Sequence, residues 1–79
     1  MPDMTPSDLR ATRHALGLSA AGLATLLGVQ DGRTVRRWEA GEREIPGPVH
    51  VLLDSILQSR AVRRYFGLSL PEDGKSQPD

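Results

Sequence analysis

Three arginines within five residues carry the clearest chemical signal of this 79-residue chain. Arg33, Arg36 and Arg37 stand at positions i, i+3 and i+4, so on a helix their side chains share one face. A guanidinium donates paired hydrogen bonds to phosphate oxygens, or to the O6 and N7 atoms of guanine. Such a face is typical of nucleic-acid binding, whereas isolated arginines on a helix more often form a solvated surface.

The residues interleaved with these arginines predict which side of the helix is buried. Val35 and Trp38 lie three apart, on the face that the arginines do not use. Asp31 is the best available N-cap for this helix, and Gly41 is expected to end it. We therefore expect Trp38 in the core, and not as a stacking platform for bases.

The charges are unevenly distributed, although ten basic and ten acidic residues cancel over the whole chain. Nine of the ten bases are arginines. Without residues 1–4 and 70–79, nine bases face six acids, which gives a charge of +3. This excess favours an anionic partner.

Metal, redox and enzyme chemistry have few candidate residues here. The chain has no cysteine, and its two histidines, His14 and His50, are 36 residues apart. Ser55, His50 and Asp54 hold the side chains of a nucleophilic set, but neighbours on one exposed helix form no cleft. We expect no metal, no cofactor and no enzyme activity, with His14 exposed and His50 in a local surface contact with Asp54.

Nothing in the sequence predicts a membrane segment or an export signal. No apolar run approaches the roughly 20 residues of a membrane span, and the first residues carry an acid in place of the bases of a signal peptide. We expect a cytoplasmic protein, associated with the nucleoid when bound to DNA. Residues 1–4 are expected to be a flexible N-terminus, residues 5–68 one domain, and residues 69–79 a disordered tail.

Helical periodicity runs through the domain, and no segment alternates in the manner of a strand. The predicted fold is therefore all-α, a compact bundle of five helices. N-caps and stops are expected at Thr5 and Gly17, Ser19 and Gly28, and Asp31 and Gly41; a fourth helix begins near Pro48, and a fifth runs from Ser59 to Phe66.

Four segments of the chain resemble a known family: LRATRHALGLS, LATLLGV, RTVRRWEAGER and IPGPV. Together they are similar to the Xre-type, lambda-repressor-like (Cro/repressor) helix-turn-helix family, over residues 5–58. The resemblance implies that the second and third helices form a helix-turn-helix, with the third helix entering the major groove. Ala20 stands where the family usually has glutamine, and the turn is one residue longer, which leaves open whether Gln30 or Asp31 reaches DNA.

The resemblance also implies roles for individual residues. Its expected base contacts are Gly32, Arg33, Arg36 and Arg37, and its expected phosphate contacts are Ser19, Ala20, Thr34 and Arg43. An ion pair between Arg13 and Glu39 is expected to tie the first helix to the third.

Two late clusters allow two interpretations each. Tyr65, Phe66, Leu68 and Leu70 could complete the core or form a dimer interface. Arg60, Arg63 and Arg64 form a further basic group, which we interpret as a solvated face, with distal phosphate contact as the alternative.

The function that these patterns favour is sequence-specific binding to double-stranded DNA. The expected protein is a homodimeric transcriptional repressor, an autorepressor of phage or mobile-element type, bound to an inverted repeat. One alternative is the antitoxin of a toxin–antitoxin pair, which would bind its toxin through the segment beyond Leu68. Another is a protein-interaction module with no affinity for DNA.

Overall fold

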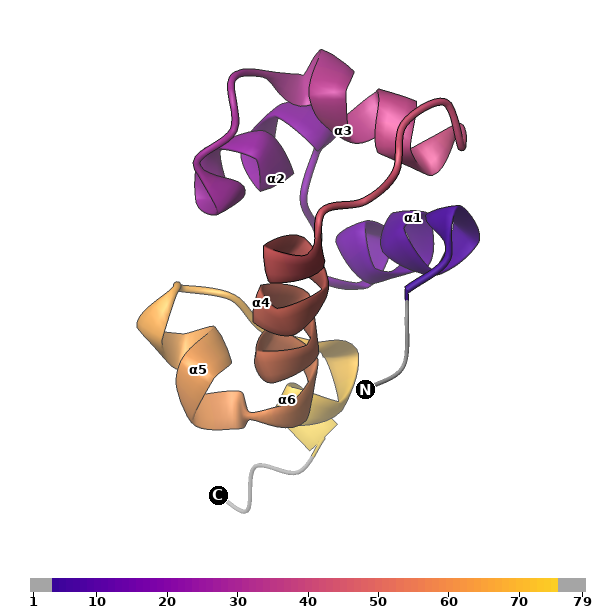
Figure 1. The fold of residues 1–79 in the computed structure, drawn as a ribbon. Helices are drawn as coiled ribbons and strands as arrows, with labels where there is room; N and C mark the ends of the chain where they lie inside the picture. Colours follow the sequence, from indigo (N-terminus) through magenta and orange to yellow (C-terminus); the bar gives the residue numbers. More distant parts are fainter. Residues whose placement is uncertain (1–3, 76–79) are drawn as a thin grey trace.

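The computed structural model describes residues 4–75, and within this range it contains six α-helices and no strand. The all-α prediction is confirmed, but the prediction of five helices is wrong by one (Figure 1). The helices are α1 (Pro6–Ala15), α2 (Ala20–Leu27), α3 (Gly32–Glu39), α4 (Gly47–Gln58), α5 (Arg60–Tyr65) and α6 (Pro71–Lys75).

Polar N-caps set the start of the first three helices, as the sequence predicts. The Thr5 hydroxyl accepts from the Asp8 backbone N–H at 3.0 Å, and the Asp8 carboxylate accepts from the Thr5 N–H at 3.1 Å. The Ser19 hydroxyl accepts from the Gly22 N–H at 2.9 Å. These bonds satisfy N–H groups that have no partner inside a helix, and so they fix where α1 and α2 begin.

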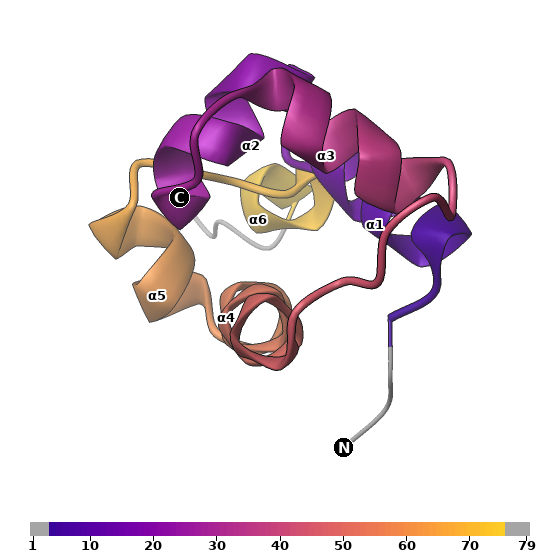
Figure 2. The ribbon, with the colours of Figure 1, turned by 45° about the horizontal axis from the view of Figure 1, so that its top comes forward.

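The described residues form one apolar core, and Figure 2 shows how the helices are arranged relative to one another. In Figure 1, α2 and α3 lie at one end of the molecule, α5 and α6 lie at the other, and α4 connects the two ends. Within residues 4–75, no helix has the length and apolar character that a membrane crossing requires. The buried apolar residues are Leu9, Leu16, Ala20, Leu23, Ala24, Val35, Trp38, Ile45, Val49, Leu53, Ile56 and Leu70.

The segment after Leu68 is folded, which corrects the expectation of a disordered tail from residue 69. Leu70 is 9% exposed and belongs to the core, and α6 follows it directly. The Asp73 carboxylate accepts from the Leu70 backbone N–H at 2.8 Å, so it caps the start of α6. The remaining part of the predicted tail, residues 76–79, lies outside the described residues, as do residues 1–3 of the predicted flexible N-terminus.

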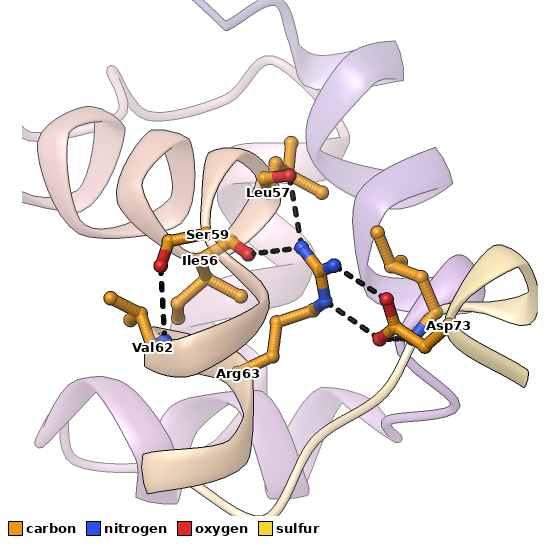
Figure 3. Close-up of polar contacts among 7 residues, drawn as sticks. Ile56, Leu57, Ser59, Val62, Arg63 and Asp73 are labelled. Atoms are coloured by element: carbon orange, nitrogen blue, oxygen red, sulfur yellow. Dashed lines mark hydrogen bonds and ion pairs between the residues drawn. The ribbon is translucent and has the colours of Figure 1, made fainter. Parts of the chain in front are cut away.

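Arg63 is buried at 6% exposure, so interpreting it as part of a solvated face is wrong. Its guanidinium donates to the backbone oxygens of Ile56 and Leu57 at the end of α4, at 2.9 and 3.0 Å. It also donates to both Asp73 oxygens, at 2.8 and 2.6 Å (Figure 3). Arg60 and Arg64 are exposed, as expected.

His50 makes contacts other than the predicted surface contact with Asp54. Its Nδ1 accepts from the Met4 backbone N–H at 2.9 Å. The ring proton therefore lies on Nε2, which donates to the Ile45 carbonyl at 3.2 Å. His50 thus holds the start of the described chain against α4 and the loop before it.

Candidate nucleic-acid interface

Helix α3 has one buried face and one charged face. Val35 and Trp38 are 0% and 4% exposed, which confirms the side predicted to face the core. Arg33, Arg36 and Arg37 are all exposed on the other side. Because the apolar face is fixed by packing, the three guanidinium groups are held outward from one short helix.

Helix α2 packs directly behind α3, and residues 28–31 form the turn between them. Leu23 and Ala24 are buried at 0% and 2% exposure, and the small Ala24 allows close packing. Gly28 ends α2 with a φ of 73°, in the left-handed region that glycine enters without steric cost. The two helices thus form a tight pair that supports the arginine face.

The two helices lie close together at Gly32. A Cβ atom on this residue would lie 2.8 Å from the Ala21 nitrogen and 3.1 Å from the Ala20 carbonyl carbon, so only glycine fits without movement of the backbone. A side chain at position 32 would therefore point at α2. Gly32 itself is half-buried, and its expected base contact stays a prediction. Ala20 is 4% exposed and packs in the core, and its expected phosphate contact stays a prediction.

The starts of α2 and α3 differ in charge. Asp31 caps α3, and its carboxylate accepts from the Thr34 N–H at 3.3 Å, so a negative charge already lies at the positive end of this helix. Ser19 caps α2 with a neutral hydroxyl, and both Ser19 and Ala21 are exposed. Of the two helix starts, α2 is therefore the better place for a phosphate.

The predicted ion pair between Arg13 and Glu39 is confirmed. Arg13 Nε and Nη2 donate to the two Glu39 oxygens at 2.6 and 3.0 Å, and Nη1 donates to the Leu18 carbonyl at 3.1 Å. The hydrogen bonds to Glu39 raise the pKa of Arg13 above its usual value. This bidentate pair links α1 to the last turn of α3.

The other predicted phosphate-binding residues lie at the edges of this surface. Arg43 is exposed in the loop that follows α3, and Thr34 is half-buried on the first turn of α3. Sequence reasoning missed Arg10, an exposed residue of α1 that lines a hollow together with Arg36. Its position three residues before Arg13 places both arginines on the same face of α1, and this spacing is the signal that could have found it.

The late apolar cluster divides between the two interpretations. Phe66 and Leu68 are half-buried and pack against the core, and Leu70 is buried within it. Tyr65 is 83% exposed, and its ring packs edge-on against Phe66 with 5.0 Å between the centroids. Of the predicted dimer residues, Tyr65 alone presents a largely uncovered side chain.

No family model, no curated protein and no solved structure matches the chain. What supports a function is therefore the geometry of α2 and α3 and the charges that they carry.

Proposed function

We propose that the protein is a sequence-specific transcriptional repressor that binds double-stranded DNA. In this proposal, α2 and α3 act as a helix-turn-helix, and α3 enters the major groove. In the same proposal, the protein is an autorepressor, so its binding site lies upstream of its own gene.

One observation carries the proposal. Arg33, Arg36 and Arg37 project from a short helix whose opposite face is anchored by the buried Val35 and Trp38. A rigid helix that presents several guanidinium groups fits the width of the major groove and the acceptor atoms of guanine. The nearby Glu39 does not offset this charge, because it pairs with Arg13 on α1.

The exposed residues divide into two roles. Arg33 and Arg37 are exposed about one helical turn apart on α3, and we assign base contacts to them. Ser19 caps α2, Arg43 is exposed in the loop after α3, and we assign phosphate contacts to both. The two kinds of contact should differ in effect: base contacts determine specificity, whereas phosphate contacts raise the affinity for DNA of every sequence.

A single recognition helix contacts too few base pairs to select one site in a genome, so we propose that two copies bind an inverted repeat. Tyr65 is the last residue of α5, and its side chain is 83% exposed. Its exposed ring is the side chain to which we assign the contact between copies.

The antitoxin alternative has less support. It requires a toxin-binding segment beyond Leu68, but the described part of that segment packs on its own domain through Leu70 and through the ion pair between Arg63 and Asp73. A segment used in this way is not free to wrap a second protein.

Selection of bound sequences from a pool of random duplex DNA tests the proposal. We expect an inverted repeat to emerge, and the affinity for this repeat to exceed the affinity for shuffled DNA by a factor on the order of 1,000 or more. Wild-type protein that enriches no sequence and shows no salt-dependent binding to any duplex would contradict the proposal and favour a protein-interaction module.

A further inference from the structure

A shallow hollow between α1 and α3 brings together two exposed arginines that are far apart in the sequence. Arg10 comes from the middle of α1, and Arg36 comes from α3. The hollow has a volume of about 300 Å³, and it is lined by Arg10, Arg13, Arg36, Glu39 and Ala40.

Two of the positive charges in this hollow are not balanced by acids. Arg13 and Glu39 neutralise one another through their two hydrogen bonds. Arg10 and Arg36 make no ion pair with any residue between positions 4 and 75. The hollow therefore carries a net positive charge and leaves two guanidinium groups available to an anion.

We propose that Arg10 and Arg36 together bind one phosphodiester group of the DNA backbone, next to the groove that α3 enters. This inference rests on the proposed function and adds α1 to the DNA-binding surface. The hollow, with about 300 Å³, is much larger than the space that one water molecule requires, so a phosphate group has room to enter it. Ala40, the residue that follows α3, contributes only a small side chain to the lining of the hollow.

The ion pair between Arg13 and Glu39 gives this site its rigidity. It joins α1 to α3 directly beside the hollow, so the backbone positions that carry Arg10 and Arg36 are held at a fixed separation before DNA binds. Preorganisation of this kind lowers the entropic cost of binding. Arg36 thereby acts as a phosphate contact, while Arg33 and Arg37 keep the base contacts.

The test measures binding to a short duplex of random sequence, so it does not depend on knowing the operator. Fluorescence anisotropy gives Kd between about 50 and 200 mM KCl, and the slope of log Kd against log salt reports the number of phosphates neutralised. The variants are Arg10→Ala, Arg36→Ala and the two combined. Arg64→Ala is the matched control, because Arg64 is also exposed but lies on α5. Arg10→Lys keeps the charge.

We expect each single variant to bind more weakly than wild type, and the double variant to lose about 0.9 from the slope, because the two arginines share one phosphate. With this smaller slope, the affinity of the double variant falls between 50 and 200 mM KCl by a factor about 3.5 times smaller than the factor for wild type. Arg64→Ala and Arg10→Lys should keep the wild-type slope.

Two outcomes would overturn the inference while leaving the proposed function intact. Wild-type affinity and slope in Arg10→Ala would show that α1 does not touch DNA. A loss of about 1.8 in the double variant would show two separate phosphates. Absence of binding by the wild-type protein would instead overturn the proposed function itself. Helical circular dichroism checks that each variant is folded.

Discussion

Arg63 and Asp73 join three helices through one ion pair. Asp73 accepts from Arg63 Nη2 at 2.6 Å and from Nε at 2.8 Å, while Nη1 donates to the carbonyls of Ile56 and Leu57 (Figure 3). Those carbonyls lie at the end of α4, where a helix leaves acceptors without an internal partner. Arg63 of α5 therefore caps α4 and anchors α6 at the same time.

Acid should weaken this connection in a defined direction. The hydrogen bonds from Arg63, and then the one from the Leu70 N–H, lower the pKa of Asp73 from 3.8 to about 2. Because the folded pKa lies below the unfolded value, the stabilisation is complete above about pH 4 and is lost as the pH falls through 2. We expect Asp73→Asn to lower the melting temperature at neutral pH, and the difference from wild type to shrink between about pH 4 and pH 2.

Thermal unfolding followed by circular dichroism at a series of pH values checks this prediction. Glu72→Gln is the control, because Glu72 lies on the same helix but is exposed. The carboxylate that accepts from Arg63 is that of Asp73. A difference between Asp73→Asn and wild type that stays constant down to about pH 2 would contradict the assignment.

The two arginine triplets show what the local sequence can predict and what it cannot. Arg33, Arg36 and Arg37 have the same i, i+3, i+4 spacing as Arg60, Arg63 and Arg64. The first triplet could be predicted as exposed because Val35 and Trp38 define the opposite face of the same helix. The position of Arg63 depends on Asp73, ten residues further along the chain in a segment whose polar composition predicts no structure. Spacing on one helix carries no information about such a partner.

Trp38 is expected to be essential for folding. Its indole is 4% exposed and packs in the core beneath the arginine face. We expect Trp38→Ala to destabilise the domain by about 3–5 kcal/mol, a large share of the total stability of a small domain. Urea unfolding measures the change. A variant with wild-type stability would show that Trp38 does not hold α3 against the core.

We expect that position 32 tolerates no residue larger than glycine. A methyl group here would lie 2.8 Å from the Ala21 nitrogen, so α2 and α3 would have to separate. We expect Gly32→Ala to cost about 1–3 kcal/mol of stability and also to weaken binding to the selected repeat. Gly47→Ala is the matched control: a methyl group on Gly47 would have no neighbouring atom within 4 Å, and we expect little or no loss. Equal stability of the two variants would contradict the close contact.

Sequence reasoning succeeds for the local signals of the site and misses its long-range packing. Thr5, Ser19 and Asp31 cap their helices as predicted, because a cap depends only on residues three positions away. The close approach of Gly32 to Ala21 depends on how the two helices pack against each other. The same holds for the hollow that pairs Arg10 with Arg36.

The arginines assigned to base contacts should control specificity and not stability. Arg33 and Arg37 are exposed, so their removal opens no cavity. We expect Arg33→Ala and Arg37→Ala each to cost about 1–3 kcal/mol of binding to the selected repeat, with unchanged melting. Arg43→Ala is the contrasting variant, and it should weaken binding to all sequences alike. Competition between the repeat and shuffled DNA separates these effects, and an unchanged ratio for Arg33→Ala would remove Arg33 from the base-reading set.

Assembly on DNA is expected to depend on Tyr65. Its ring is 83% exposed, and it is held edge-on against Phe66, so little side-chain freedom is lost when a second copy covers it. Phe66 itself packs on the core and would confound a test of assembly. We therefore expect Tyr65→Asp to leave the fold intact and to make binding to an inverted repeat less cooperative, while Tyr65→Phe behaves as wild type.

Sedimentation of the protein with and without the selected DNA decides between one and two bound copies. Two wild-type proteins per duplex at saturation are expected, because two half-sites supply the discrimination that one recognition helix lacks. With Tyr65→Asp, the second copy should bind only at higher protein concentration, since the contact between copies no longer assists it. One protein per duplex at saturation, on a selected site without two-fold symmetry, would overturn the dimer, and undiminished cooperativity in Tyr65→Asp would place the contact elsewhere on the molecule.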